Sequence, residues 1–585
     1  MKDITKANQD VVAEENNSTT YVDEDDKLLA QMGYKQELYR GFNAFMSFSF
    51  CFTAVAVISG CSILFPYGLK TGGPVVMIWG WIIGSVFTII NGLSMAEICS
   101  SYPSAGSVYH WAGMLAPPKW APFFSYICGW FNFIGNAASD ASFAYGFAQV
   151  VSACVTLGTN GDVQLPTIAL VGMAAFVSLL WALKNIMRVD HQGWFNNASA
   201  IYQIASTFIV IACLLIASPR LSSSEFVWTQ YNNGSNLPSV SYACCIGLLM
   251  CLFSFSGYEG GAHMAEETKN ASSSAPKGIV YTCIASAFTG ILYITGLLYA
   301  CQGKISEVLD DTNGQSDQAV VNVYKLAFTD ADGKENLAGA IAMTVMLIIN
   351  IFFAGFSSMT VTSRIGFAMA RDGALPGSKF LYKINPRTLT PDRIIFLVFF
   401  MDVALCLLPL ISDTAFAAIT SITCIGYQIS YAIPIFLRLT FSRKTFKRSS
   451  FHLGPFSEVI GWISVIWLFI TSIFFLLPNE FDENGYQTAT NFNYTSVVVG
   501  GVLFIALAYW FLPAPHGARH FFVGPKREDT VEDNKKVSDE DEGYSQALLH
   551  QDDGISQQYQ DNQKNAYSGN KHQQDIEIEE EQGRR

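Results

Sequence analysis

Long apolar stretches, separated by shorter polar segments, follow one another along the chain from residue 42 to residue 513. A helix needs about 20 mostly apolar residues to cross the hydrocarbon core of a bilayer. Stretches of this kind lie at 42–69, 74–98, 123–154, 166–183, 195–218, 240–265, 278–300, 337–363, 394–412, 414–439, 456–477 and 495–513. The pattern predicts an all-α membrane protein with about twelve transmembrane helices.

The composition agrees with a membrane protein and shows where the polar residues lie. Only 14% of the residues are charged, whereas soluble domains carry about 25%. Residues 1–40 and 528–585 are polar and mostly acidic, and they hold too few apolar residues to form a core. We therefore expect two disordered tails. No basic, aromatic-rich segment points to nucleic-acid binding.

Charge in the loops predicts the orientation. An even number of spans places both tails on one side of the membrane. The loops expected on that side are basic, above all between Arg364 and Arg393 and between Arg438 and Arg448, whereas the opposite loops are acidic, as in Glu480–Glu483. The positive-inside rule then predicts cytoplasmic tails, and the plasma membrane is favoured over the vacuolar or Golgi membrane.

Sequons agree with this orientation. Asn233 and Asn493 begin N-x-S/T sequences within predicted outer loops, so both are candidate glycosylation sites. Asn493 lies close to the expected membrane boundary.

Cysteine and motif content argue against several classes of protein. The thirteen cysteines are scattered without a CxxC spacing, which favours buried core residues over disulfides or metal ligands. No P-loop sequence GxxxxGKS or GxxxxGKT occurs, so we expect no ATP-driven pumping. With no metal-ligand cluster and no nucleophile–base pair apparent, we predict neither an enzyme nor a bound cofactor.

Two predicted spans contain helix-breaking residues at mid-membrane depth. Helix 1 carries Ser59, Gly60 and Cys61, and helix 6 carries the glycine-rich run Phe255–Gly261. Such breaks leave free amides at one half-helix and free carbonyls at the other, which together suit a zwitterion. Their spacing of five helices indicates two five-helix inverted repeats, 41–218 and 240–440, followed by two extra helices at 456–513. The alternative is that the glycines only permit close helix packing.

Several motifs resemble those of the amino acid–polyamine–organocation transporter superfamily. They lie at Gly33–Leu38, Gly92–Pro103, Gly129–Asn132, Gly257–Glu259, Ala370–Pro376 and Phe522–Pro525. They are most similar to the eukaryotic branch that holds plant bidirectional amino-acid transporters and fungal GABA and choline permeases. The resemblance implies a fold like that of the leucine transporter, with substrate held between the broken helices 1 and 6.

The breaks and the resemblance together indicate the substrate-binding residues. We expect the substrate carboxylate to meet the amides around Gly60, and its amine to meet carbonyls of helix 6 and the Glu259 carboxylate. The candidates are Ser59, Gly60, Cys61, Asn132, Asn136, Phe255, Ser256, Gly257, Tyr258 and Glu259.

Buried ionisable residues are costly in a membrane and often functional. Glu259 is the leading candidate for pairing with the substrate or taking up a proton, and a structural cap of the half-helix is its alternative. His263, Asp140 and Glu266 are further candidates for proton coupling or gating. A satisfied core histidine is the alternative for His263, and a topology anchor is the alternative for Glu266.

Helix 8 offers a weak sodium site. Ser357 and Ser358 are small hydroxyl residues at mid-span, although such residues are equally common as helix-packing contacts. We otherwise predict no metal.

The sequence therefore predicts a secondary-active permease for amino acids or GABA-like amino compounds. Its partners would be a small amino substrate, the lipid bilayer and a coupling proton. A choline or polyamine permease on the same scaffold, favoured if Asp140 lies in the pocket, is the first alternative. A nutrient sensor that binds amino acids without transporting them is an alternative of another class.

Overall fold

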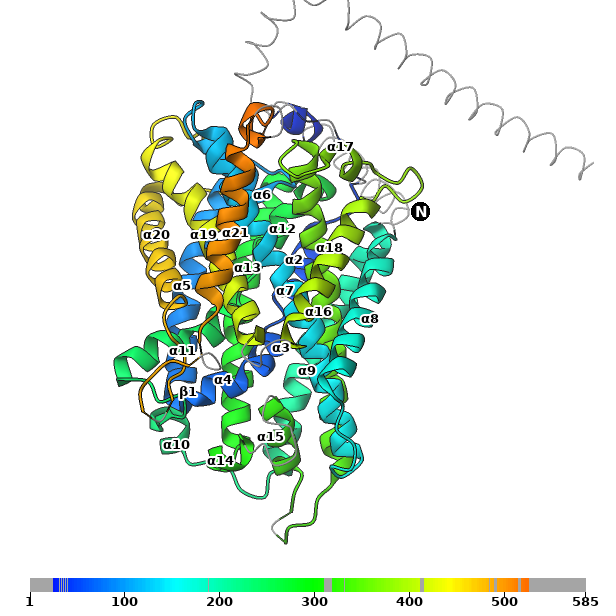
Figure 1. The fold of residues 1–585 in the computed structure, drawn as a ribbon, viewed down its shortest axis with the longest axis vertical. Coiled ribbons are helices and arrows are strands. Elements are labelled where there is room, and N and C mark those ends of the chain that lie inside the picture. The colour runs from blue at the N-terminus through cyan, green and yellow to red at the C-terminus, as the bar shows by residue number, and fades with distance from the viewer. Residues whose placement is uncertain are drawn as a thin grey trace, which may run out of the picture. The chain divides into compact units, whose positions relative to one another are not determined.

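The computed structural model describes residues 25–30, 32, 34, 36, 38, 40–187, 189–309, 318–330, 332–410, 415–482, 484–488, 492–513 and 517–525. Most of these residues are helical, and Figure 1 shows the helices running alongside one another. The predicted tail 528–585 and the first part of the predicted tail 1–40 lie outside the described residues.

Within the described ranges, ten helices are long and apolar enough to cross a membrane. They are α2 with α3 (Ala44–Val55, Val57–Ile63), α5 (Gly73–Ser101), α7 (Ala121–Gly158), α8 (Thr167–Asn185), α9 (Val189–Ala217), α13 (Ala271–Ala300), α16 (Leu337–Arg371), α18 (Asp392–Cys406), α19 (Ala415–Thr440) and α20 (Ser457–Phe474). Two shorter apolar helices, α11 (Val240–Ser254) and α21 (Thr495–Phe511), occupy the sixth and twelfth predicted positions. The prediction of an all-α, multi-pass membrane protein is confirmed.

Short elements continue the broken helices, connect the long helices or cover the two ends of the bundle. The helices are α4 (Phe65–Lys70), α6 (Ser107–Leu115), α10 (Ser224–Thr229), α12 (Gly260–His263), α14 (Ile305–Val308), α15 (Ala319–Ala327) and α17 (Ser378–Leu381). Single 3-10 turns are η1 (Ala265–Glu267), η3 (Leu408–Leu410), η4 (Gly454–Phe456) and η5 (Ala518–His520). Strands β1 (Thr71–Gly72) and β2 (Asn232–Asn233) pair antiparallel. Figure 1 places α10, α14 and α15 at one end and α17 at the other.

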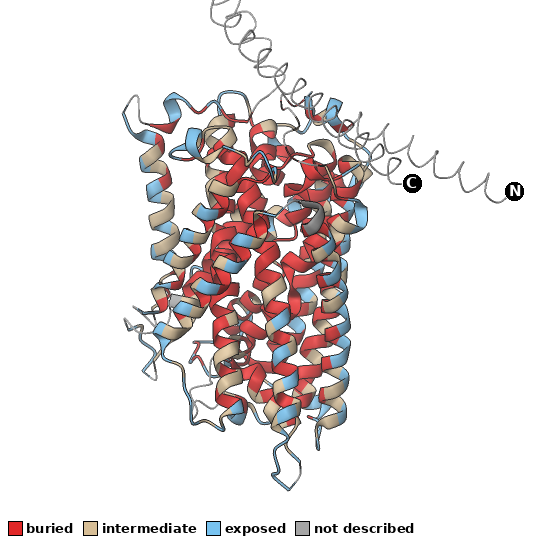
Figure 2. Ribbon diagram, turned by 90° about the vertical axis from the view of Figure 1, so that its right-hand side faces the viewer, coloured by how far each residue is buried: buried red, intermediate tan, exposed pale blue. Residues whose placement is uncertain are grey.

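Burial separates central helices from peripheral ones. The windows in Ala44–Ile63, Ala121–Gly158 and Phe416–Thr440 are the most buried, whereas only a third of the windows in α8 and α20 is buried. Figure 2 shows buried residues along the middle of the bundle and exposed ones on its outer helices. The central helices are therefore the ones able to hold a buried polar site.

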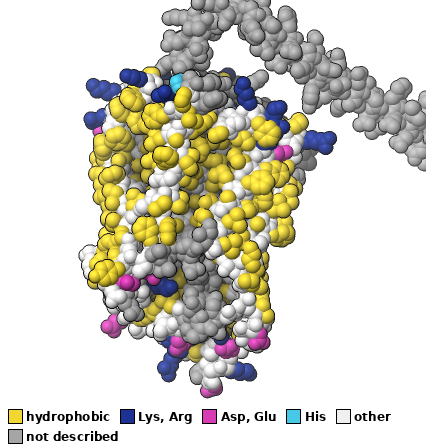
Figure 3. Space-filling model, viewed as in Figure 1, with side chains coloured by type: hydrophobic (Ala, Val, Ile, Leu, Met, Phe, Trp, Pro, Cys, Tyr) yellow, Lys and Arg dark blue, Asp and Glu magenta, His cyan; other side chains and the backbone are white. Residues whose placement is uncertain are grey.

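The outer faces are strongly apolar. Trp194, Ile216 and Phe504 are 70%, 85% and 72% exposed, and Figure 3 shows hydrophobic side chains over the middle of the visible face with charged ones toward the ends. Soluble proteins rarely expose apolar surface on this scale. A bilayer is the environment that makes such a surface stable.

Both ends of the described chain lie at the same end of the bundle. Asp25 accepts hydrogen bonds from the amides of Asn270 and Ala271 at the start of α13, and Pro525 packs against Gly113 of α6. An even number of transmembrane spans requires both ends of the chain to lie on the same side. We expected disorder through residue 40, whereas the described residues from Asp25 onward contact the bundle.

Candidate functional site

Helix 1 is interrupted at Ala56. This residue has φ 44° and ψ 57° and separates α2 from α3. A left-handed conformation costs a non-glycine residue about 1 kcal/mol, so the surrounding packing must impose it. A second interruption at Leu64 separates α3 from α4.

The break lies three residues before the predicted one. Gly60 sits inside α3, and its amide donates to the carbonyl of Ala56 at 3.0 Å. The amides left without an intrahelical partner in the first turn are those of Val57, Ile58 and Ser59. Gly60 and Cys61 therefore do not form the break, and the expected carboxylate contact moves toward Ala56.

Gly60 serves close packing. A Cβ atom on Gly60 would lie 2.9 Å from the Cα of Ser254 in α11, which is shorter than real contacts allow. Helix 1 and helix 6 therefore touch through backbone at this point. This was the alternative given for the glycine in the sequence.

We expect Gly60→Ala to destabilise the protein by about 1–3 kcal/mol, because the added methyl group overpacks the contact with Ser254. Thermal unfolding in detergent measures the loss. Gly172→Ala is the matched control, because open space surrounds Gly172 in α8. Equal unfolding temperatures for the two variants would contradict the close contact.

Helix 6 breaks where the sequence predicts. α11 ends at Ser254, residues 255–259 form turns, and α12 begins at Gly260. Gly257 has φ +90°, a conformation that suits glycine because it has no Cβ. The amide of Gly257 donates to the hydroxyl of Tyr431 in α19 at 3.3 Å.

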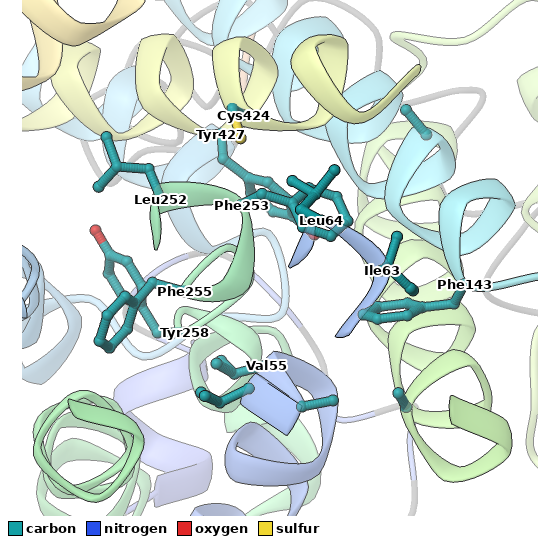
Figure 4. Packing of buried hydrophobic residues seen from close by; sticks show 14 of the residues in the cluster. Val55, Ile63, Leu64, Phe143, Leu252, Phe253, Phe255, Tyr258, Cys424 and Tyr427 are labelled. Atoms are coloured by element: carbon teal, nitrogen blue, oxygen red, sulfur yellow. The ribbon is translucent and has the colours of Figure 1, made fainter. Parts of the chain in front are cut away.

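The two interrupted helices lie side by side. The contact between Gly60 and Ser254 joins α3 to the last turn of α11. Figure 4 shows Leu64 of helix 1 next to Phe253 of helix 6, with Tyr427 of α19 beside them, whereas Phe255 lies with Tyr258. Apolar side chains therefore enclose the region between the two breaks.

Glu259 is the carboxylate at the helix 6 break. Its side chain is fully buried. Oε1 accepts from the Asn132 amide of α7 at 3.1 Å, and Oε2 accepts from the Tyr431 hydroxyl of α19. Glu259 precedes α12 but makes no side-chain cap to it, so the capping alternative does not describe its contacts.

His263 lies one turn after Glu259. Its Nδ1 is 2.9 Å from the carbonyl of Ala105, so Nδ1 carries the proton and donates. Its Nε2 is 3.9 Å from Oε1 of Glu259 and has no hydrogen-bond partner among the described residues. One ring nitrogen of His263 is thus hydrogen-bonded, and the other is turned toward the Glu259 carboxylate.

A polar stripe on α7 runs away from Glu259. Asn132, Asn136 and Asp140 are spaced four residues apart and so share one helix face. Asn136 donates to the carbonyl of Asn132 at 2.9 Å and accepts from the Tyr427 hydroxyl at 2.8 Å. The stripe runs from Asn132, which donates to Glu259, to Asp140, which is fully buried and whose carboxylate oxygens have no hydrogen-bond partner among the described residues.

Asp140 has a second buried carboxylate as its neighbour. Asp402 of α18 is also fully buried and interacts electrostatically with Asp140. One turn beyond Asp402, the Cys406 thiol contacts the carbonyl of Ala141 at 3.6 Å. Asp402 accepts from Ser178 of α8 at 2.9 Å. Asp140 thus faces α18, whereas Glu259 contacts α7 and α19.

Ion pairs close the end of the bundle that carries both chain termini. Arg371 at the end of α16 donates to both oxygens of Glu266, at 3.0 and 3.2 Å. Glu266 also accepts from the amide of Ala105, which leads into α6, at 3.0 Å. Burial opposes ionisation of Glu266, but Arg371 outweighs it and holds the pKa of that carboxyl below its usual value. The pair is therefore charged at neutral pH.

Two further contacts reinforce this closure. Arg364 pairs with Glu267 at 2.5 Å, both fully buried. Tyr34 donates to Asp372 at 3.0 Å, and the guanidinium of Arg371 lies 4.0 Å from the centre of the Tyr34 ring. We call Glu266, Glu267, Arg364 and Arg371 the inner ion-pair cluster.

Comparison with known proteins shows the family of this chain. The model of a family described as "Amino acid permease" matches residues 42–504. The chain belongs to that family. It is 36% identical to the amino-acid permease BAT1 of Arabidopsis thaliana over 503 residues, which cover 85% of this chain and 95% of the relative.

Two further relatives have lower sequence identity to this chain. The BAT1 homolog of Oryza sativa subsp. japonica is 34% identical over 85% of this chain and 94% of its own length. The GABA-specific permease of Saccharomyces cerevisiae is 28% identical over 83% and 84%. These relatives show the family and the transport function, and the fold shows the membrane setting.

The sequence analysis missed two tyrosines of this permease. Tyr427 and Tyr431 lie one turn apart on α19 and contact Asn136 and Glu259. A polar run from Tyr427 to Tyr431 within an otherwise apolar span was the available signal. The ring centres of Tyr258 and Tyr431 are 5.0 Å apart. Tyr431 therefore contacts two of the substrate-binding candidates, Tyr258 and Glu259.

The sodium candidates of the permease have other contacts. Ser357 donates to Asn196 of α9 at 2.5 Å, so its hydroxyl is engaged by a neighbouring helix. Ser358 is buried in the same helix, and its carbonyl accepts from the Thr362 hydroxyl at 3.1 Å. Packing contacts account for Ser357.

The two sequons differ in their surroundings. Asn233 lies in β2, and its side chain bonds the backbone of Leu237. Asn493 is only 8% exposed, and its amide donates to the carbonyls of Phe475 and Leu477. Asn233 is therefore the better placed of the two for glycosylation.

Proposed function

We propose that this permease carries amino acids or GABA-like amino compounds by secondary-active alternating access, with the substrate held between the broken helices 1 and 6. The observation that supports this best is the buried Glu259 carboxylate at the helix 6 break. It gives a substrate ammonium group an anionic partner next to the carbonyl end of α11. The names of the plant and yeast relatives agree with such substrates.

The arrangement suggests which groups meet the substrate. The ammonium group would approach Glu259 and the carbonyls of Phe255 and Ser256, which follow the last turn of α11. The carboxylate would face helix 1 near Ala56. The side chains of Asn132 and Tyr431 hold Glu259 in place, so the carboxylate is oriented before substrate arrives.

We propose a proton as the coupling ion. The α7 stripe joins Glu259 to Asp140, and Tyr427 lies alongside it. Two neighbouring buried carboxylates, Asp140 and Asp402, cannot both stay charged without a cation between them. A proton shared there would couple its own movement to rearrangement of α7 and α18.

Replacing Asp140 with asparagine should remove most of the stimulation of uptake by an inward proton gradient, while exchange of labelled for unlabelled substrate continues. Tracer uptake into proteoliposomes, with and without the gradient, measures both. Asp162→Asn is the control, because Asp162 lies in a turn after α7 and is exposed. Unchanged gradient stimulation in Asp140→Asn would refute this role.

The proposed orientation places the inner ion-pair cluster and both tails in the cytoplasm. Basic residues of the α16–α18 and α19–α20 loops share that end, in accordance with the positive-inside rule. The plasma membrane is the proposed location. Cysteine-free, singly tagged protein in intact cells would show the side on which each terminus lies.

Flux measurement separates the permease from its alternatives. Protein reconstituted in liposomes should exchange labelled amino acid across the membrane, whereas a non-transporting sensor would bind without flux. Competition by unlabelled amino acids, GABA, choline and spermidine then identifies the substrate class. Competition by choline or spermidine alone would favour the cation permease.

A further inference from the structure

A cationic cavity opens where α19 and α20 meet at the end of the bundle that carries the chain termini. Its volume is about 360 Å³, and it lies outside the substrate region. It is lined by Arg438, Leu439, Arg443, Phe446, Arg448, Ser457 and Glu458. We call it the α19–α20 arginine pocket.

Arg438 is the buried base of this pocket. It is 5% exposed, pairs with Glu97 of α5 at 2.8 Å and donates to Ser457. Its Nη1 has no hydrogen-bond partner among the described residues. The centre of the Phe446 ring lies 4.6 Å from Cζ of Arg438, but a ring supplies no oxygen acceptor. Leaving a buried charged donor unsatisfied is costly, so Nη1 favours an acceptor that the described residues do not supply.

The other two arginines stand at the mouth of the pocket. Arg443 forms a two-bond pair with Glu458, at 2.9 and 2.6 Å, and both side chains are about half exposed. Arg448 forms no ion pair within the described part of the chain. Three guanidinium groups therefore face two carboxylates, Glu97 and Glu458, and leave the pocket with excess positive charge.

The charge suits a phosphate group. Guanidinium groups present planar pairs of donors that match phosphate oxygens, and they lose less hydration than an ammonium group on binding. Lys444 and Lys447 on the same loop add to the positive field. Basic pockets between transmembrane helices at the cytoplasmic face bind anionic headgroups by this chemistry.

Exposed apolar side chains lie next to the pocket-lining residues in sequence. Phe441 directly follows α19 and is 55% exposed, Phe456 ends η4 and is 67% exposed, and Val459 and Trp462 in the first turns of α20 are 57% and 42% exposed. A molecule seated here would have its charge on the arginines and its hydrocarbon against these apolar side chains.

We propose that the α19–α20 arginine pocket binds a phosphate group, carried by an anionic phospholipid of the adjacent leaflet. Arg438 and Arg448 contact the phosphate oxygens, and Arg443 does so while keeping its pair with Glu458. The acyl chains lie along Phe441, Phe456 and Trp462. A free phosphate ion has the same charged end without the hydrocarbon.

Ligand-induced stabilisation of the full chain tests this. The purified protein in detergent is unfolded by heat with increasing dioctanoyl phosphatidylglycerol, dioctanoyl phosphatidylcholine or inorganic phosphate, at constant ionic strength. Bound ligand raises the unfolding temperature in proportion to its occupancy. We expect saturable stabilisation by phosphatidylglycerol at concentrations where phosphatidylcholine has no effect.

A pair of double variants locates the site. Arg443→Gln with Arg448→Gln should weaken phosphatidylglycerol binding about tenfold or more. Lys444→Gln with Lys447→Gln removes the same charge from the same loop but changes no pocket-lining residue. This variant should therefore lose clearly less affinity for phosphatidylglycerol. All four positions are exposed, so both variants should fold.

Each outcome decides the proposal. Stabilisation by phosphatidylglycerol without an effect of phosphate supports a lipid headgroup. Equal apparent affinity for phosphate and phosphatidylglycerol keeps the phosphate site but assigns it to a soluble ion. Equal losses in the arginine and lysine variants, or no preference for phosphatidylglycerol over phosphatidylcholine, would overturn it.

Discussion

Replacing Glu259 with glutamine is expected to lower uptake by at least about tenfold, because an ionic hydrogen bond to the substrate amine is lost. The glutamine has nearly the same shape, so the loss reports on charge rather than on packing. A carboxylate accepts from both Asn132 and Tyr431, whereas an amide has only one acceptor oxygen. The variant therefore also loses the fixed orientation of this side chain.

Initial uptake rates, normalised to the protein in the membrane, measure this effect. Glu225→Gln is a control for the same chemical change at a residue of α10 far along the chain from either break. Tyr431→Phe should also lower uptake, because it removes the hydrogen-bond donor to Oε2 of Glu259. Tyr324→Phe is the matched control, because it removes a hydroxyl that bonds Tyr293 instead. Wild-type uptake by Glu259→Gln would show that substrate does not use this carboxylate.

Replacing Arg371 with glutamine is expected to open the end of the permease closed by the inner ion-pair cluster. Removing one partner of a buried ion pair costs about 3–5 kcal/mol, since the other charge remains buried. Glu266 would then hold only neutral donors. We propose that the pair forms only when this end is closed, so that its loss shifts the population toward forms open at this end.

Cys51 reports this opening. It is fully buried on α2, where its sulfur meets Gly261 of α12. Separation of helix 1 from helix 6 at this end would expose it. The rate of alkylation by N-ethylmaleimide, followed by mass spectrometry of the Cys51 peptide, should rise at least about tenfold in Arg371→Gln.

Cys301 is the internal control. It is fully buried at the opposite end of α13, so opening at the inner cluster leaves it protected. Faster alkylation of both cysteines would mean general destabilisation rather than gating. An unchanged rate at Cys51 would contradict the assignment of Glu266 and Arg371 to a gate.

The broken helix 6 and the broken helix 1 show how far local sequence signals reach. Residues 255–261 contain three glycines and a carboxylate, and the break occurs there because Gly257 takes a positive φ. In helix 1 the glycine signal at Gly60 misled the prediction by one turn. The actual interruption falls on Ala56, which has no intrinsic preference for a left-handed conformation.

The sequence predicted the residues of the candidate site better than the contacts between them. Asn132 and Asn136 were candidates, and Glu259 was the leading one, but its partner Tyr431 lies 172 positions away in sequence. Asp402 lies beside Asp140 because α18 packs against α7, and Ser178 of α8 donates to it. Pairings of this kind depend on which helix faces meet, and local sequence does not encode that.

By itself, the sequence determined the apolar spans, the polar tails, the basic loops and the helix 6 break. Each of these depends on residues close together in the chain, since hydrophobic length, charge and glycine content act locally. Only the tertiary structure decided that helix 1 breaks at Ala56 and that Gly60 packs on Ser254. It also placed Glu97 of α5 against Arg438, because such contacts arise when distant helices pack together.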